Sequence, residues 1–403
     1  MILNISKDKI LSRFIIAYFL FSAINSAVKQ LFYIPESIWN LVSFICGFII
    51  IVFFVHSLKY IFKYSTFCLF YSYSIFFLIV LWSCIINDVI YIANATIWPL
   101  FICIPLGLAI YSLDNINLFY NYVLNKSFLL AFVLILLVIF PQEDGKYNMF
   151  MSYSLLFPLL IHINEFCNTK KKYYLLILLL EIGIIIFFGS RGALLSIAFF
   201  IIYKFFVKRT FKVSVIFGLC LLGIGIVYVN FATIGNWLLN KFETYNLYSR
   251  TLSLIFQNEG TSLSNRDIVW RYCNDMIFEK PILGWGFYGW KEQLVYAMAG
   301  GENGTGTYPH NIFIELCLDF GLVLGVLISI VLILSFIRFF SFRDFLEKDL
   351  FVILFAIGFL PLLFSGSYSQ SPVFYLYMYY FIRTYKSKKK LFLDEDLSYD
   401  SCT

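Results

Sequence analysis

The sequence predicts an all-α, polytopic integral membrane protein, and its composition and apolar pattern carry that prediction. Of its 403 residues, 61% are hydrophobic and only 13% are charged, whereas a soluble domain is roughly 45–50% apolar. The apolar residues form runs of about 16–25, a length that crosses the roughly 30 Å hydrocarbon core of a bilayer as helix. These runs are continuous rather than alternating, which favours helices over a transmembrane barrel.

Twelve such runs are present, and we expect each to be a transmembrane helix. They cover about residues 10–28, 38–56, 67–86, 97–112, 127–141, 149–163, 173–189, 191–207, 213–231, 309–337, 349–365 and 372–385. The first run lacks a cleavage site for a signal peptide, so we interpret it as a retained span. The chain then divides into nine N-terminal spans, a long polar loop, three C-terminal spans and a tail, at residues 1–231, 232–308, 309–385 and 386–403.

The basic residues predict the orientation of these spans, because cytoplasmic loops are enriched in lysine and arginine. With the N-terminus inside, 21 of the 30 basic residues lie on the cytoplasmic side. Six of the remaining nine lie in the long loop, and long loops translocate largely regardless of charge. We therefore expect cytoplasmic termini and an extracytoplasmic loop. The net charge of +6 reflects these short loops and does not indicate a nucleic-acid partner.

Two charged residues, Glu181 and Arg191, interrupt the apolar stretch from Tyr173 to Tyr203. Even low estimates put the cost of an arginine at mid-bilayer at about 2.5–3.5 kcal/mol. Arg191 either reaches the headgroups from a tight outer turn or holds an anion in a polar cavity, where the glycines of Gly-Ser-Arg-Gly let backbone approach a phosphate. We expect Glu181 to face the helix bundle and to pair with a polar group near Arg191.

A surface helix is expected in the long loop, starting at Ser264-Asn265-Arg266-Asp267 and ending before Pro281. The start resembles a capping box, and the apolar residues that follow have helical spacing. Arg266 falls in the first turn, where the helix dipole disfavours a cation. An anion bound between the guanidinium and the free N–H groups would reverse that preference. The alternative is an ordinary solvated arginine.

His310 is the only one of the three histidines expected on the extracytoplasmic side. We expect His56 and His162 at the cytoplasmic ends of spans, as interface residues. His310 lies in Tyr-Pro-His-Asn at the mouth of a span, and a histidine can act as a general base near neutral pH. The alternative is a polar helix-capping residue. Glu315 and Asp319 follow on the same helix, where they either orient the histidine or the arginines or lie among the headgroups.

Between the surface helix and His310, the segment Lys280–Trp290 combines glycines with three aromatic residues. Trp285, Tyr288 and Trp290 are candidate sugar contacts if their faces are exposed. They are equally candidate membrane-interface anchors, the commoner role of tryptophan and tyrosine near a bilayer. The sequence shows neither the spacing of a metal site nor a nucleotide-binding loop, so we expect no metal and no cofactor.

Four motifs together resemble the O-antigen ligase and O-antigen or capsule polysaccharide polymerase family. They are Gly-Ser-Arg-Gly, Asn-Arg-Asp-x-x-Trp, Pro-Ile-Leu-Gly-Trp-Gly and Pro-His-Asn-x-x-x-Glu-x-x-x-Asp-x-Gly, in this order between Glu181 and Gly325. Each motif alone is weak, whereas their order and spacing are specific. Two departures are mild: Asn265 stands where the family often has glycine, and Asp319 stands where it often has glutamate.

The resemblance implies an inner-membrane bacterial glycosyltransferase of the all-helical, lipid-linked-sugar type, similar to the GT-C class. Its donor would be a glycan on undecaprenyl pyrophosphate, used on the outer side of the membrane without a metal. By resemblance, Arg191 and Arg266 hold the pyrophosphate and His310 activates the acceptor hydroxyl, with Asn311, Glu315 and Asp319 in support. A flippase and a chain-length regulator are the implied partners besides the lipid-linked glycans and the bilayer.

Three functions stay open at this point. A polymerase passes the glycan to another lipid-linked repeat unit, and we favour it because Pro-His-Asn-Ile-Phe-Ile-Glu looks closer to the polymerases. A ligase passes the glycan to the lipid A core. A transporter of lipid-linked sugar is the alternative from a different class, but transporters usually show repeat symmetry and ionisable groups at the midplane of several helices. In this sequence the unusual residues gather on one outer face instead.

Overall fold

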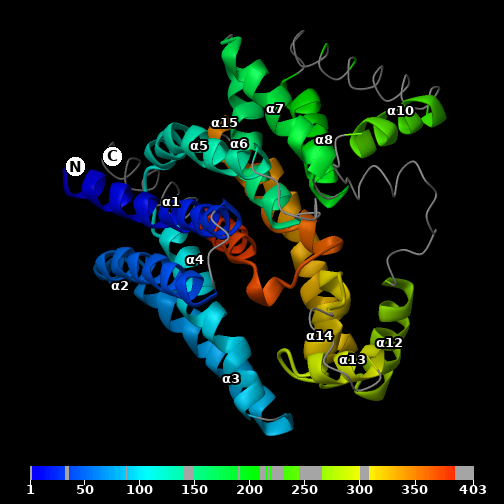
Figure 1. Ribbon diagram of the computed structural model, residues 1–403. Coiled ribbons are helices and arrows are strands. Elements are labelled where there is room, and N and C mark those ends of the chain that lie inside the picture. Colours follow the sequence, from blue (N-terminus) through cyan, green and yellow to red (C-terminus); the bar gives the residue numbers. More distant parts are fainter. Residues whose placement is uncertain are drawn as a thin grey trace. The chain divides into compact units, whose positions relative to one another are not determined.

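The computed structural model describes residues 2–31, 36–87, 89–139, 149–169, 171–188, 191–208, 215, 218, 231–244, 266–299, 308–342 and 344–385 (Figure 1). Every regular element in these ranges is helical, which confirms the all-α prediction. The expected span 213–231 lies almost entirely outside the described residues, as do the tail and much of the long loop.

The helices follow the apolar runs of the sequence, with irregular turns at a few positions. They are α1 (Ile2–Leu31), α2 (Glu36–Ile86), α3 (Val89–Trp98), η1 (Pro99–Cys103), α4 (Ile104–Tyr111), α5 (Ile116–Ile139), α6 (Met149–Asn168), α7 (Tyr173–Phe188), α8 (Arg191–Lys208), α10 (Phe231–Thr244), α12 (Arg266–Glu279), α13 (Trp290–Ala299), α14 (Ile312–Ile337), η2 (Arg338–Ser341), α15 (Phe345–Gly358), η3 (Leu360–Leu363) and η4 (Tyr368–Gln370). Residues 372–385 form a further helix.

Three helical stretches within the described residues are long and apolar enough to cross a membrane: Gly47–Ile86, Ile116–Leu136 and Ile312–Ile337. Shorter apolar helices cover Ala95–Tyr111, Tyr173–Ile186 and Gly192–Val207. The molecule is therefore a helical protein of membrane type, whereas the number of twelve spans stays a prediction.

The expected spans 38–56 and 67–86 form one element, α2, rather than two helices separated by a loop. The only non-helical residue inside α2 is Ser65 (φ −139°, ψ 26°). Its hydroxyl donates to the carbonyl of Ile61 (2.6 Å) and contacts the hydroxyl of Ser112 (2.8 Å). A serine that bonds back to the preceding turn commonly bends a helix, so the polar residues expected to form a loop instead mark a kink.

The expected span 97–112 also differs, because it consists of three consecutive helical elements. A π-helical turn, Pro99–Cys103, joins α3 to α4. Proline has no N–H to donate and its ring clashes with the preceding turn, and a wider π turn accommodates it.

The chain forms two compact units, each described here by itself. Unit 1 comprises Met1–Ile15, Phe54–Phe119 and Asn265–Thr403, and unit 2 comprises Ile16–Phe53 and Tyr120–Ser264. Unit 1 therefore holds α3, α4 and α12 to α15 with the C-terminal helix. In unit 2, α6 packs against both α7 and α8.

The two ends of the described chain meet at one turn of unit 1. Lys7 forms an ion pair with Asp114, and Asp8 accepts hydrogen bonds from the backbone N–H groups of Asp114 (3.1 Å) and Asn115 (2.8 Å). Arg383 donates from Nε to the carbonyl of Leu113 (2.8 Å). Two basic residues that were expected to mark cytoplasmic loops, Lys7 and Arg383, are thus buried structural groups.

Candidate active site

The helix predicted in the long loop is present as α12, and its buried face has the expected spacing. Val269, Cys273, Met276 and Ile277 are buried, three or four residues apart as on one face of a helix. Ile268 and Tyr272, which share the apolar pattern, are instead exposed. The predicted N-cap, Ser264 or Asn265, lies outside the described residues, and α12 is described from Arg266 onward.

One face of α12 lies against the turn that carries His310, beside the start of α14 (Figure 1). The indole Nε1 of Trp270 donates to the carbonyl of Pro309 (2.8 Å). Trp270 follows Arg266 by four residues, so the two side chains lie on the same face of the helix. The hydrogen bond of Trp270 therefore fixes Arg266 on the side of α12 that faces His310.

The backbone of His310 is strained and its ring is held by a neighbour. His310 has φ 55°, in the left-handed region that non-glycine residues rarely adopt. The ring of Tyr308 lies 3.9 Å from the imidazole, measured between centroids, and the Tyr308 hydroxyl is 3.1 Å from the hydroxyl of Ser365. Such strain costs about 1–3 kcal/mol and clusters at active sites, which makes this turn a candidate for function.

Asn311 is the N-cap of α14 rather than a group that faces a substrate. Its side-chain oxygen accepts from the N–H groups of Phe313 (2.9 Å) and Ile314 (3.4 Å). This cap starts the helix directly after the strained residue and so holds His310 at the mouth of α14. Its supporting role is therefore positional.

Arg266 and His310 each bury a polar atom that has no hydrogen-bond partner among the described residues. These atoms are Arg266 Nε and His310 Nδ1. Buried polar groups almost always have a partner, so two such atoms in neighbouring residues indicate a ligand site. Burial, and secondly the positive charge of Arg266, together lower the pKa of His310 to about 4. The site thus combines a neutral imidazole with a fixed cation.

The glycine-rich loop after α12 forms hydrogen bonds with α14 at a point where that helix is interrupted. Gly321 (φ 79°) interrupts that helix, which frees the carbonyls of Leu318 and Asp319 from helical hydrogen bonds. The loop satisfies both: Trp285 N donates to Leu318 O (2.7 Å) and Gly286 N donates to Asp319 O (3.1 Å). A Cβ on Gly284 (φ 66°) would lie 2.5 Å from the Gly321 nitrogen, so this packing requires glycine.

The two carboxylates on α14 hold this frame together instead of contacting the histidine or the arginine. Asp319 Oδ1 accepts from Tyr288 N (2.9 Å) and Trp290 Nε1 (2.7 Å), and Oδ2 accepts from the Tyr368 hydroxyl. Glu315 accepts from the Ser367 hydroxyl and from Tyr368 N (3.2 Å). No hydrogen bond joins either carboxylate to Arg266 or His310 within the described structure, so both act at a distance from the reacting groups.

The expectation of an open aromatic platform does not hold for two of its three residues. Trp290 is 0% exposed and Tyr288 is 7% exposed. Trp285 is half-buried, and the Lys280 ammonium lies 3.8 Å from the centroid of its ring. Trp290 and Tyr288 are buried because they donate hydrogen bonds to the Asp319 carboxylate at the point where α14 is interrupted, from the indole Nε1 and the backbone N–H respectively.

Arg191 is the first described residue of α8, and its side chain lies outside the described part of the structure. The next residue, Gly192, lies so close to α6 that a Cβ would collide with the Tyr153 hydroxyl. The helix start is thereby held against α6. Arg191 belongs to unit 2 and Arg266 to unit 1, so their convergence on one ligand stays a prediction.

Sequence reasoning missed a buried polar cluster in unit 2. His162 Nε2 lies 2.9 Å from the hydroxyl of Ser127, and its Nδ1 lies 2.9 Å from Glu181 Oε1. Both His162 and Glu181 are fully buried, so the expectation of His162 at the interface was wrong. Glu181 faces the bundle as expected, but its partner is His162. The charge at Glu181 inside an apolar run was the signal that a partner existed.

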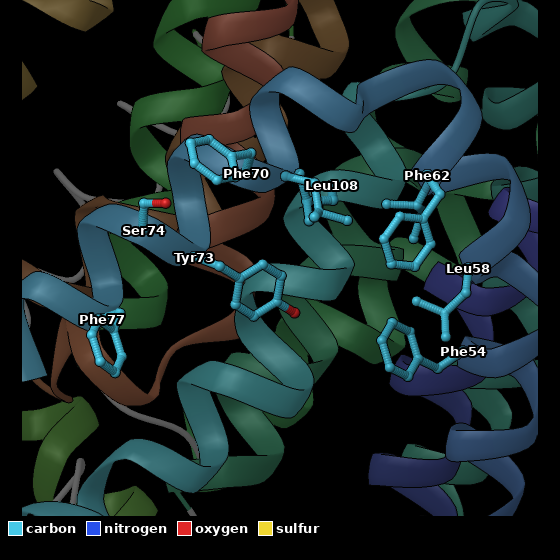
Figure 2. Close-up of a pocket in the computed structure, with 10 residues that line it drawn as sticks. Phe54, Leu58, Phe62, Phe70, Tyr73, Ser74, Phe77 and Leu108 are labelled. Atoms are coloured by element: carbon cyan, nitrogen blue, oxygen red, sulfur yellow. The ribbon is translucent and has the colours of Figure 1, made fainter.

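Two cavities of unit 1, both lined almost entirely by apolar side chains, lie apart from these residues. Side chains of α2 and α4 line one of about 470 Å³, including Phe54, Phe62, Tyr73 and Leu108 (Figure 2). A second, of about 490 Å³, is lined by apolar residues such as Trp82, Leu283 and Phe320. Neither of these two cavities is lined by Arg266 or His310.

Comparison with protein families gives an independent assignment for this region. Residues 175–329 match the family described as O-antigen ligase (Wzy_C), somewhat more than a third of the chain. The comparison with curated proteins found no match, and neither did the comparison with solved structures. The matched stretch contains Arg191, Arg266 and His310, and it confirms the predicted resemblance to the O-antigen ligase family over residues 175–329.

Proposed function

We propose that the protein polymerises undecaprenyl-pyrophosphate-linked oligosaccharide repeat units into O-antigen or capsular polysaccharide on the outer face of the bacterial inner membrane. One observation carries this proposal. Within the family region, a buried guanidinium nitrogen and a buried imidazole nitrogen lack partners side by side. A cation and a neutral base are the two groups that a metal-independent glycosyl transfer from a pyrophosphate needs.

In this proposal His310 removes the proton from an acceptor sugar hydroxyl. The hydroxyl oxygen attacks the anomeric carbon of the donor as the bond from that carbon to the pyrophosphate oxygen breaks. The pyrophosphate leaves with the bonding electron pair, and the proton stays on the imidazole until it passes to solvent. Attack opposite the leaving group inverts the anomeric carbon. Arg266, together with Arg191 by the family resemblance, stabilises the charge that develops on the pyrophosphate.

Donor binding also tunes the base in this scheme. With the site empty, burial and the charge of Arg266 hold the pKa of His310 near 4. A pyrophosphate that pairs with Arg266 offsets its positive charge, and a nearby negative charge raises the pKa of an imidazole. His310 therefore becomes a stronger base when the donor is in place, which limits proton transfer to the productive complex.

The proposal includes the membrane arrangement expected from the charge pattern: twelve transmembrane helices of GT-C-like type, both termini in the cytoplasm and residues 232–308 outside. One part of this arrangement, both termini on the same side, is supported by the ends of the described chain, because Lys7 and Arg383 contact the same turn. That arrangement puts Arg266 and His310 at the outer surface, where lipid-linked repeat units are used. A flippase and a chain-length regulator are proposed partners.

A ligase is the second candidate, because the matched family carries that description. Complementation of a strain deleted for this gene distinguishes a polymerase from a ligase when the surface polysaccharide of the strain is resolved on a gel. A polymerase restores a ladder, and its deletion leaves single repeats on the lipid A core. Deletion of a ligase leaves long chains on the carrier lipid and none on the core. A strain that instead accumulates unpolymerised repeats on the cytoplasmic side would support the transporter and overturn both.

Matched variants in the same strain test the site. His310→Ala and Arg266→Ala are expected to abolish the ladder at wild-type protein levels. His56→Ala and Arg271→Ala are the controls, because His56 is exposed on α2 and Arg271 is exposed on α12 with only an ion pair to Asp267 (3.8 Å). If all four variants restore the ladder, the assigned residues do not carry the reaction.

A further inference from the structure

Three side chains of unit 1 form a polar cluster that the proposed mechanism does not use. The Tyr288 hydroxyl accepts from Lys291 Nζ (2.9 Å) and from Gln370 Nε2 (3.0 Å). The Lys291 ammonium also lies 4.7 Å from the centroid of the Tyr288 ring. Gln370 is exposed, Lys291 is half-buried and Tyr288 is buried, so the cluster opens to solvent on one side.

The cluster presents unused hydrogen-bond donors. A tyrosine oxygen that accepts two hydrogen bonds still has its own proton to donate, and no described residue accepts it. Burial first, and then the charges of Glu315 and Asp319, raise the pKa of Tyr288 to about 12, so that proton is retained at neutral pH. An ammonium has three donors and a primary amide has two, and here each uses one. Donors in this excess suit a ligand rich in acceptors.

Lys291 carries a charge that nothing in the described structure neutralises. No carboxylate among these residues forms an ion pair with it, and burial lowers the pKa of its ammonium. Half-buried charges usually have a partner. Asp319 does not supply one, because Oδ1 is bonded to Tyr288 N and Trp290 Nε1, at the backbone end of the tyrosine. An anionic ligand at the hydroxyl end would fill this role.

A short segment, Ser365–Gln370, connects the cluster to the candidate active site. Ser365 contacts the hydroxyl of Tyr308, whose ring packs on His310, and Gln370 bonds to Tyr288. Five residue steps span at most about 18 Å in an extended chain, so Ser365 and Gln370 are separated by no more than the length of a short oligosaccharide. Tyr288 (φ 64°) and His310 (φ 55°) are the two non-glycine residues with left-handed backbone in the described chain. Tyr288 contacts Gln370 at one end of the segment, and His310 is linked through Tyr308 to Ser365 at the other end.

We propose that Lys291, Tyr288 and Gln370 form a carbohydrate subsite that binds an acidic sugar of the glycan through its carboxylate. This inference rests on the proposed function, because it assumes that a glycan approaches His310. The ammonium pairs with the carboxylate, the tyrosine hydroxyl donates to it, and the amide bonds to ring hydroxyls. The subsite sets which repeat unit is accepted and takes no part in the bond-making step.

Binding of two matched probes tests the subsite directly. The full-length protein in phosphatidylcholine nanodiscs is titrated with a glucuronic acid–N-acetylglucosamine disaccharide and with the same disaccharide after reduction of the carboxylate to the alcohol. We expect the acidic form to bind about tenfold more tightly, as for a hydrogen-bonded charge. Lys291→Met removes the preference and Lys291→Arg keeps it, while Tyr288→Phe weakens binding of the acidic form.

Lys280→Met is the control, because it removes the same charge from the same outer segment at a lysine that stacks on Trp285. The inference is overturned if the two disaccharides bind equally or neither binds, or if the preference survives in Lys291→Met. It is also overturned if exchange of part of the lipid for phosphatidylglycerol abolishes the preference, because the cluster then takes headgroups. His310→Ala separates the two proposals: retained transfer activity in that variant refutes the proposed function, whereas the binding preference for the acidic disaccharide does not depend on His310.

Discussion

Two histidines of this protein occupy opposite chemical situations. His162, in unit 2, is fully buried and has a partner at each ring nitrogen, Ser127 at Nε2 and Glu181 at Nδ1. His310, in unit 1, has strained backbone and lies beside Arg266, and its buried Nδ1 has no partner among the described residues. The hydrogen bonds of the first arrangement are satisfied by the fold itself. We interpret the second as open to a ligand.

The difference shows how a structural polar group can be told from a functional one in a helical membrane protein. Both residues are polar groups beside apolar helices, so polarity alone does not separate them. A group that the fold needs finds all its hydrogen bonds within the fold. A group that binds a substrate leaves one hydrogen-bonding atom free for it, and strained backbone conformations cluster at such sites. The following predictions test this distinction.

The largest effect is expected at His310. His310→Ala removes the base, so the transfer rate falls by about 10²–10⁴-fold, whereas thermal inactivation of the purified protein is unchanged within error. Turnover of a lipid-linked repeat unit in nanodiscs measures the transfer rate, and the fraction of protein still folded after heating measures thermal inactivation. A variant that loses activity only in proportion to folded protein would place His310 with His162 as a structural residue.

Removal of the cation comes next. Arg266→Ala is expected to lower the rate by about 10²–10³-fold, the usual effect of losing one group that stabilises developing charge. Arg271→Ala, on an exposed face of the same helix, is expected to retain wild-type turnover. Equal effects of the two substitutions would mean that α12 contributes only general positive charge.

The buried cluster should respond in stability rather than in chemistry. His162→Ala leaves Glu181 buried without its partner and is expected to destabilise the protein by about 3–5 kcal/mol. The double variant His162→Phe with Glu181→Leu removes both polar groups and should be more stable than His162→Phe or Glu181→Leu alone. A double-mutant cycle of these three variants, followed by thermal inactivation, measures the coupling. If the stability losses of the two single variants simply add in the double variant, the pairing is contradicted.

The smallest effect is a shift in pH dependence. In the proposed mechanism activity needs neutral His310, so kcat/KM should fall as the pH drops through the free-enzyme pKa, near 4. Arg266→Gln removes the second cause of the lowered pKa while burial remains. The acid limb of kcat/KM should then move upward but stay below 6.5, the ordinary value. An unchanged limb would show that Arg266 does not act on His310.

Much of the fold follows from the sequence, because each helix in lipid must satisfy its own backbone. The apolar runs therefore located most described helices, and the spacing of Val269, Cys273, Met276 and Ile277 located α12. The kink at Ser65 and the π-helical turn at Pro99 were not predicted, since both depend on local hydrogen bonds that periodicity does not encode.

The candidate site was predicted in part. Arg266 and His310 could be selected as residues because charge and imidazole are rare beside apolar helices, and the structure brings these two together. The roles of Asp319 and Trp290 could not be selected, because they depend on the break at Gly321 that leaves backbone carbonyls for the loop to satisfy. The pairing of His162 with Glu181 likewise joins residues on different helices.

The sequence by itself determined that this protein is helical and of membrane type and that residues 175–329 resemble the O-antigen ligase family, because composition, run length and motif order are properties of the chain alone. Tertiary structure alone decided which polar side chains are satisfied and which are open. Hydrogen bonds form between atoms about 3 Å apart, and it is the packing of α12 against α14 that buries an atom of Arg266 and an atom of His310 away from any hydrogen-bond partner in the described part of the chain.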